Sequence, residues 1–231
     1  MGKRANFRAR KRDWGLRRAL HWEVMHLLSK VGIRVHYVIL NASMMQILGE
    51  ERPAVPAGYE TRVVGIDEIL PYGDSVEGLS REFLESAFAR GDVCTANFRD
   101  GELVGYGFTS YTRARVTEQL DVLVPAGFRY PYKSWTHPAH RRANLSSMRG
   151  YVRRQTLPAG HEQRSIDYVE THNYASLLHG YRHPRERGIP MGFCGWVTVF
   201  GRQLPFNSRR ARWIGFEFVR KDDTRPRQYV W

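Results

Sequence analysis

The segment Tyr130–Arg154 constrains the fold of this chain most, because it has the pattern of a strand, a tight loop and a helix in direct succession. Its first residues are aromatic or β-branched and favour a strand, which ends near Pro138 because proline cannot donate to a ladder. A loop of small and positively charged residues follows, and then apolar residues recur at helical spacing at Leu145, Met148 and Val152. Free amides and the helix dipole both favour an anion at such a helix N-terminus, so the segment predicts a place for phosphate.

This segment resembles the acyl-CoA-binding motif of the GCN5-related N-acetyltransferase (GNAT) superfamily, in which a strand ending near a proline leads into R/Q-x-x-G-x-G/A. Pro138 and Arg141 match that pattern, while Asn144 and Ser146 stand at its two glycine positions. Asparagine tolerates the left-handed backbone region better than most residues, and serine is small. A backbone cradle for phosphate is therefore still feasible.

A second part of the signature follows in the same order. Residues 164–171 are typical of a strand, Asn173 and Ser176 match the N-x-x-S/A start of the next helix, and residues 192–202 resemble the sixth strand. The resemblance extends from about Tyr59 to Val219, most of the chain. It implies an α/β fold with a GNAT-like mixed, mostly antiparallel twisted sheet flanked by helices, and here an N-terminal helix-plus-strand extension.

The chain divides into four parts on this interpretation. Residues 1–13 form a basic tail, residues 14–55 the helix and strand of the extension, residues 56–220 the GNAT-like acyltransferase domain, and residues 221–231 a second tail.

The helix of the extension has an amphipathic pattern. Gly32 is a suitable C-cap, and the polar face begins with Arg17 and Arg18. Three interpretations stay open: packing on the catalytic domain, which we favour, contact with a membrane surface, and contact with nucleic acid. The strand-like residues 33–40 also favour docking, because a free strand edge needs a partner. The apolar positions at helical spacing are Leu16, Leu20, Val24, Leu27, Leu28 and Val31.

Further strands and one helix are expected in the main domain. Asp100 and Gly101 indicate a hairpin between strands at 93–98 and 103–111. The other elements expected before Tyr130 are a strand at 61–64, a helix at 80–90 and a continuation of the sheet at 116–124. Towards the C-terminus, residues 201–208 are expected to join the sixth and seventh strands, and residues 213–219 to form the seventh.

The net charge of +13 has two interpretations. The first interpretation is codon bias towards arginine on a solvated surface, because only five of the 36 basic residues are lysines. Attraction to an acidic partner is the other: CoA phosphates, an acyl carrier protein, nucleic acid or an anionic membrane.

Cysteines, histidines and hydropathy add a few expectations. Cys94 and Cys194 are far apart and are expected to be reduced, buried thiols of a cytoplasmic protein. No apolar run approaches the length of a membrane span. We expect no metal site, because the histidine pairs lack a third ligand at a recognised spacing.

The resemblance implies direct attack of an amine on an acyl thioester. Amides of residues 142–146 would hold the diphosphate, and a main-chain N–H near the end of the strand at Trp135 or Thr136 would polarise the thioester carbonyl. The implied cofactor-binding residues are Trp135, Thr136, His137, Arg141, Arg142, Ala143, Asn144, Leu145, Ser146, Asn173 and Ser176.

Three residues are candidates for acid–base catalysis. Glu170 and His172 lie where the fifth strand ends and could accept the proton of the ammonium; their alternative roles are a surface carboxylate and a capping or packing histidine. Many members of the superfamily carry a tyrosine seven residues after the helix asparagine, where this chain has Gly180. Tyr181 is the neighbour, about 100° away on a regular helix, and is the candidate acid or a core aromatic.

The function implied is transfer of an acyl group from acetyl-CoA or a longer acyl-CoA to a primary amine of a small metabolite, amino sugar or peptide. One alternative is a fatty-acyl transferase that uses CoA or an acyl carrier protein and acts on an amino acid or peptide. An alternative from another class is a non-catalytic, basic nucleic-acid-binding module, whose affinity would fall steeply with salt.

Overall fold

The computed structural model describes residues 11–12, 15–44, 52–156, 164–171, 173 and 189–223. The chain forms two compact units, each assembled from separate stretches of the sequence. We call residues 44–114 and 124–167 the central unit, and residues 1–43, 115–123 and 168–231 the terminal unit. The four-part division expected from the sequence, with limits at residues 13, 55 and 220, stays a prediction.

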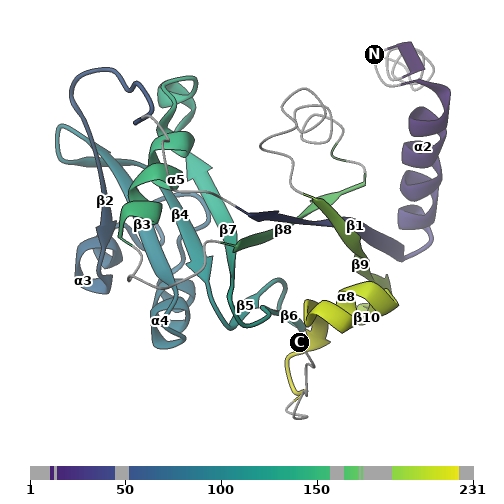
Figure 1. The fold of residues 1–231 in the computed structure, drawn as a ribbon. Coiled ribbons are helices and arrows are strands. Elements are labelled where there is room, and N and C mark those ends of the chain that lie inside the picture. The colour runs from purple at the N-terminus through teal and green to yellow at the C-terminus, as the bar shows by residue number, and fades with distance from the viewer. Residues whose placement is uncertain are drawn as a thin grey trace. The chain divides into compact units, whose positions relative to one another are not determined.

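An antiparallel sheet in the order β2-β3-β4-β7 is the frame of the central unit (Figure 1). Asp100 and Gly101 join β3 to β4 with φ of 51° and 84°, the left-handed pair that a two-residue hairpin requires. The first residues of a fifth strand, β8, pair with β7 in parallel. The strands are β2 (Tyr59–Val64), β3 (Val93–Arg99), β4 (Glu102–Ser110), β7 (Phe128–Thr136) and β8 (Arg164–Glu170).

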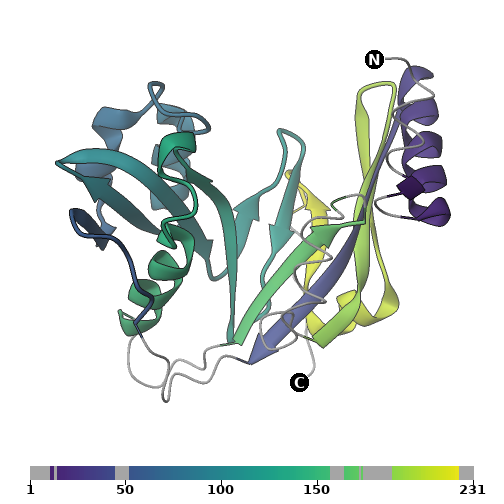
Figure 2. The same ribbon diagram turned by 90° about the horizontal axis from the view of Figure 1, so that it is seen from above.

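Helices cover both faces of this sheet (Figure 2). One face carries α3 (Ile66–Ile69), the 3-10 helix η1 (Leu70–Tyr72) and α4 (Arg81–Ala89), and the other carries α5 (Leu145–Gln155). The core lies on the α4 face, where burial of apolar side chains drives packing. Its members include Ile69, Leu84, Ala87, Cys94 and Phe108.

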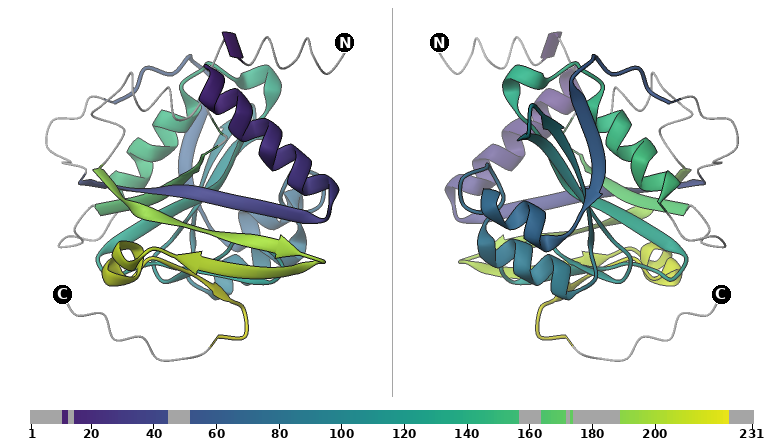
Figure 3. Two further views of the ribbon diagram at one scale, coloured as in Figure 1. Left: turned by 90° about the vertical axis from the view of Figure 1, so that its right-hand side faces the viewer. Right: turned by 90° about the vertical axis from the view of Figure 1, so that its left-hand side faces the viewer.

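The terminal unit is built on a second antiparallel arrangement, β10-β9-β1. The end of β8 lies next to β1, where the amide of Thr171 donates to the carbonyl oxygen of Tyr37 at 2.9 Å. Helix α2 lies over β1 (Figure 3). The elements are α2 (Leu16–Lys30), β1 (Ile33–Met44), β9 (Ile189–Val199), β10 (Arg202–Asn207) and α8 (Arg209–Ile214), and a small sheet contains β5 (Arg113–Arg115), β6 (Leu120–Leu123) and β11 (Glu217–Arg220).

The predicted mixed, mostly antiparallel α/β sheet flanked by helices is confirmed, and so are the N-terminal helix and strand. β1 pairs with β9 from Ile33 opposite Val199 onwards, so the strand of the extension is docked as expected. The expectation that the apolar face of α2 packs on the protein is wrong, because Leu16, Leu20 and Leu27 are about half or more exposed.

Three expectations about strands are also wrong. Residues 201–208 are not a connection, because Phe200 and Gly201 both have positive φ and turn the chain back into β10. Trp213 lies in a helix, α8, which Ser208 caps by accepting from the amide of Ala211 at 3.2 Å. Residues 116–124 contribute β6 to the small sheet with β11 rather than extending the large one.

Two further observations concern the described residues. None of their helices is long and apolar enough to span a bilayer. Cys94 and Cys194 are both buried free thiols.

Candidate functional site

Strand β7 carries a bulge close to its end. Tyr132 pairs with Phe108 and Trp135 with Tyr106, so Lys133 and the residue after it face a single residue of β4. Lys133 has a φ of 45°, in the left-handed region. A bulge bends a strand and leaves one residue outside the ladder, and bulges occur often beside active sites.

The other edge of β7 is paired only at its start. Among the described strands, β8 pairs with β7 at Phe128 and Arg129, and the register stops there although β7 continues to Thr136. Main-chain groups along the rest of that edge therefore belong to no ladder with β8, and such an edge can accept an extended ligand as an added strand partner.

The loop after β7 is held at both ends. The amide of His137 donates to the carbonyl oxygen of Val104 at 2.9 Å, which ties the strand end to β4. A 3-10 helix, η2 (Pro138–His140), follows, and the Nδ2 of Asn144 donates to the carbonyl oxygen of Ala54 at 3.0 Å. The loop is thus positioned by the chain on either side of it.

Two non-glycine residues of this loop adopt left-handed backbone conformations. Arg142 has a φ of 69° and Asn144 a φ of 54°, and helix α5 begins directly afterwards at Leu145. The left-handed conformation expected at Asn144 is present. An arginine in this region is strained, and such strain is concentrated at ligand sites.

Main-chain amides of residues 142–147 donate no hydrogen bond to any described part of the chain. The first amide of α5 to be engaged is that of Met148, which donates to the carbonyl oxygen of Asn144 at 3.0 Å. Side chains of Arg141, Arg142 and Ser146 are exposed, so the amides open towards solvent. We call residues 142–147 the amide cradle. It can bind an anion, because its N–H groups and the α5 dipole act together.

The segment of sequence that contains the cradle carries charge of one sign. The sequence holds no acidic residue between Asp121 and Glu162, whereas it holds seven basic ones there. These are Arg129, Lys133, Arg141, Arg142, Arg149, Arg153 and Arg154. The resulting positive potential favours an anionic ligand.

Arg149 of α5 is a buried residue of the candidate site that sequence reasoning missed. Its side chain is 4% exposed and donates to Ser134 Oγ at 3.0 Å and to Thr136 Oγ1 at 3.2 Å, and it also donates to Asn97. Burial lowers the pKa of Arg149 to about 10. The residue therefore ties α5 to the end of β7 through neutral partners.

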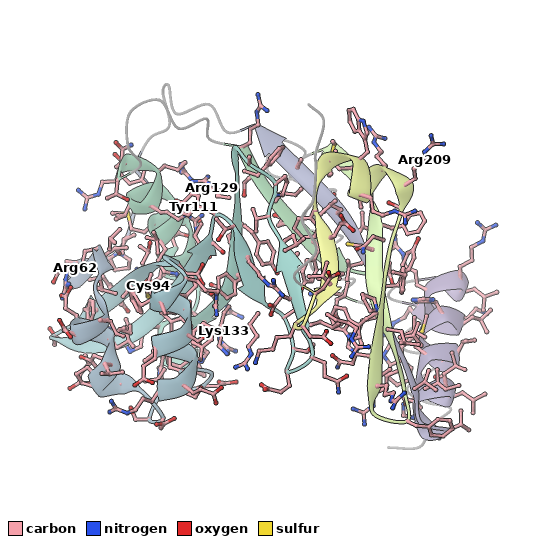
Figure 4. All side chains as sticks on the ribbon, turned by 90° about the horizontal axis from the view of Figure 1, so that it is seen from below. Arg62, Cys94, Tyr111, Arg129, Lys133 and Arg209 are labelled. Carbon is pink, nitrogen blue, oxygen red and sulfur yellow. The ribbon has the colours of Figure 1, made fainter. Side chains whose placement is uncertain are left out.

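The sequence signal for Arg149 was the pair Gly105 and Gly107 in β4. A Cβ on Gly105 would lie 2.6 Å from Nη1 of Arg149, so only glycine leaves room for the guanidinium. One turn later, Arg153 donates to Thr109 Oγ1 at 2.9 Å, and burial together with nearby Arg129 lowers its pKa to about 10. The buried guanidinium of Arg149 and the partly buried one of Arg153 thus both come from the helix that follows the cradle. Arg129 and Tyr111, which also influence Arg153, are labelled in Figure 4.

A hollow of about 600 Å³ lies on the central unit beside Lys133 and the loop 74–80. Trp135, a predicted site residue, donates from Nε1 to Glu77 Oε2 at 3.0 Å, and the hydroxyl of Tyr106 donates to the carbonyl oxygen of Glu77 at 2.7 Å. Asp74 and Glu77 give the hollow two carboxylates and Lys133 gives it one cation, so the lining is net negative and suits a positively charged ligand.

Glu170, the predicted base, has a partner that sequence reasoning missed. Its Oε1 lies 3.3 Å from Nδ1 of His36 in β1, and His36 stacks on Trp196 with ring centroids 4.4 Å apart. The two residues are far apart in sequence and meet because β1 and the end of β8 are neighbours. A carboxylate that orients an imidazole in this way can serve proton transfer.

The remaining predicted site residues are placed as follows. Thr136 accepts from Arg149, and the Nε of Arg141 donates to the carbonyl oxygen of Thr136 at 3.4 Å. Asn173 is exposed, and its amide donates to the carbonyl oxygen of Glu170 at 2.9 Å. His172, Ser176 and Tyr181 lie outside the described residues. Within the part of the chain that is described, no cluster of three or more histidine, cysteine, aspartate or glutamate side chains could hold a metal ion.

Comparison with known proteins gives matches at the level of structure only. No protein-family model matches the sequence, and no curated protein matches it. Similar solved structures include GNAT acetyltransferases. One is a tandem GNAT protein from the clavulanic acid biosynthesis pathway, solved without AcCoA (13% identity, TM-score 0.44, 87% of this chain and 59% of the other covered). Another is a GCN5-related N-acetyltransferase from Kribbella flavida (16% identity, TM-score 0.38, 62% of this chain and 52% of the other covered).

A Drosophila protein solved by structural genomics is also similar (15% identity, TM-score 0.49, 79% of this chain and 58% of the other covered). The chain thus spans between half and three fifths of the length of these three structures.

Proposed function

We propose that this protein is an N-acyltransferase that takes its acyl group from acetyl-CoA or a longer acyl-CoA. The observation that supports this most is the amide cradle, whose N–H groups are not engaged by the described chain and lie in the loop after β7 and in the first turn of α5. A CoA diphosphate satisfies such amides and is attracted by the basic residues of this segment. The resemblance of Pro138, Arg141, Asn144 and Ser146 to the acyl-CoA motif points to the same ligand.

In this proposal the pantetheine arm runs along the edge of β7 that β8 leaves unpaired after Arg129. The thioester carbonyl then lies near the end of β7, where a main-chain N–H near Trp135 or Thr136 polarises it. Arg149 is a positioning residue, since it holds Ser134 and Thr136 and so fixes the end of the strand.

The reaction proposed is direct transfer. The nitrogen of a primary amine attacks the thioester carbonyl carbon, an N–C bond forms, and the C–S bond breaks with the electron pair leaving on the CoA sulfur. Glu170, oriented against His36, accepts the proton that the attacking nitrogen loses. Asp74 and Glu77 support an acceptor that arrives as an ammonium ion, because their carboxylates attract a cation to the hollow beside Lys133. His172 and Tyr181 stay candidates for the second proton transfer.

Replacing a single cradle amide tests the proposal. Ser146→Pro removes one N–H at the second position of α5, and proline is tolerated in a first helical turn because that N–H has no intrahelical acceptor. A charge-assisted hydrogen bond contributes about 1.5–3 kcal/mol, so affinity for CoA should fall roughly 10- to 160-fold in calorimetric titration. Ser146→Ala is the matched control: it keeps the amide and should bind CoA nearly as well as the wild type.

The donor series separates this proposal from its alternatives. Acyl-CoAs of graded chain length should each raise the melting temperature, and a maximum at long chains would favour the fatty-acyl alternative. Equal CoA binding by the Ser146→Pro and wild-type proteins would refute the cradle. Tight binding to RNA that falls steeply with salt, without any shift by acyl-CoA, would favour the non-catalytic alternative.

A further inference from the structure

Helix α2 presents an apolar face to solvent. Leu16, Leu20, Val24 and Leu27 are 49%, 49%, 53% and 65% exposed, and Val31, which caps the helix, is 61% exposed. Their spacing of three and four residues places them on one side of the helix. Scattered exposed leucines are ordinary, but a continuous stripe of them marks an interaction surface.

An exposed aromatic ring adjoins the end of this stripe. Phe200, at the turn between β9 and β10, is 88% exposed, and a Cβ on Gly32 would lie 4.0 Å from its Cδ1 atom. We call the five aliphatic residues of α2 and its cap, together with Phe200, the apolar patch. It combines a helix and a hairpin tip of the terminal unit.

The patch is held in this orientation. On another side of α2, His21 Nε2 lies 3.3 Å from Thr171 Oγ1, and Ala19 is fully buried. Only Val31 and Gly32 separate α2 from β1, which pairs with β9 from Ile33 to Ala42. Figure 3 shows α2 lying over that strand. The apolar stripe therefore faces solvent because its helix is docked by other residues.

Basic side chains border the patch. Arg17 and Lys30 flank the stripe on α2, and Arg34 and Arg202 follow at the starts of β1 and β10; all four are exposed. Glu23 is the one acidic residue of α2. A second copy of the chain on this face would bring like charges together, which opposes self-association.

We propose that the apolar patch and its basic border bind the surface of an anionic lipid bilayer. A helix with an apolar face and basic edges lies in the plane of the interface, with its aliphatic side chains among the acyl chains and its cations at the lipid phosphates. Phe200 inserts beside the end of the helix. The patch does not involve the amide cradle, so this inference stands independently of the proposed reaction.

The experiment is co-sedimentation of the full chain with vesicles of phosphatidylcholine, alone or with 30 mol% phosphatidylserine. The variant Leu20→Glu/Leu27→Glu removes the centre of the patch, and both positions are exposed, so the fold should be kept. Leu204→Glu/Trp213→Glu is the matched control, because these residues are 53% and 65% exposed and lie outside the patch. Circular dichroism and thermal melts check that each variant is folded.

Wild type and control should bind the anionic vesicles at least tenfold better than the neutral ones, and the Leu20/Leu27 variant should lose that binding. A variant with Arg17→Gln, Lys30→Gln and Arg202→Gln should lose the preference for anionic lipid. Equal binding by wild type and the Leu20/Leu27 variant would overturn the proposal. So would a wild-type dimer, without affinity for vesicles, that the Leu20/Leu27 substitutions dissociate; the patch would then be a contact between copies.

Discussion

Substitutions of Arg149 should reverse the usual order of conservative and non-conservative changes. Burial lowers its pKa from 12.5 to about 10, and a difference of about 2.5 units corresponds to roughly 3 kcal/mol at 1.36 kcal/mol per unit. Against this penalty stand hydrogen bonds to Asn97, Ser134 and Thr136, which contribute about 1.5 kcal/mol each at the lower end for a charged donor. The net contribution of the guanidinium is therefore small.

Arg149→Met removes both the cost of burying the charge and the hydrogen bonds of the guanidinium. It should lower the free energy of unfolding by about 1–2 kcal/mol, because the lost hydrogen bonds outweigh the relieved burial cost by that amount. Arg149→Lys keeps a buried charge but cannot reproduce the planar fork that reaches three partners. It should therefore cost about 3 kcal/mol, more than methionine does.

Urea unfolding at pH 7, followed by tryptophan fluorescence, measures both differences from the midpoint and the m-value. Arg81→Met, at an exposed position of α4, is the control and should change stability by less than about 0.5 kcal/mol. Should the lysine variant be as stable as the wild type, or the methionine variant lose more than about 4 kcal/mol, burial and hydrogen bonding of Arg149 would not balance in this way.

Three other expectations follow from the central unit and the thiols. Gly105→Ala should destabilise the protein by about 1–3 kcal/mol in thermal melts, because its Cβ would lie 2.9 Å from Asn97 Oδ1 and 3.2 Å from the Trp135 carbonyl oxygen. Gly150→Ala inside α5 should instead stabilise it by up to about 1 kcal/mol. A Gly105→Ala variant as stable as the wild type would contradict the close packing at Gly105. Burial and Asp92 raise the pKa of Tyr132, so its contribution to stability is complete below pH 10 and is lost as the pH rises above that value. Tyr132→Phe should therefore reduce the fall of the urea midpoint at alkaline pH. An unchanged pH profile would contradict this role of Tyr132. Burial raises the pKa of Cys94 and Cys194 to about 12, so neither should react with a thiol reagent at pH 8 until urea is added; fast labelling of the native protein would show that they are accessible.

The segment around the cradle could be predicted because its structure depends on the backbone preferences of single residues. Proline cannot donate to a ladder, and asparagine enters the left-handed region readily, so the end of β7 before Pro138, the turn at Asn144 and the start of α5 follow from the sequence alone. The hairpin at Asp100 and Gly101 follows for the same reason.

Features that depend on distant parts of the chain could not be predicted. Phe200 is a poor candidate for a left-handed turn position, so the hairpin that produces β10 carried no recognisable signal. The pairing of His36 with Glu170 required knowing that β1 lies next to β8. The burial of Arg149 depends on contacts with β4, and only the two glycines opposite it in that strand indicated this in the sequence.

The N-terminal extension is part of the sheet of the terminal unit, and this changes how its helix should be interpreted. β1 pairs with β9 on one edge and neighbours β8 on the other, and it carries His36, so the segment cannot be an appendage attached to a finished domain. Because two residues connect α2 to β1, a surface that binds α2 also fixes the orientation of His36 and Glu170 relative to that surface. Binding of α2 to a bilayer would therefore give His36 and Glu170 a defined orientation towards it.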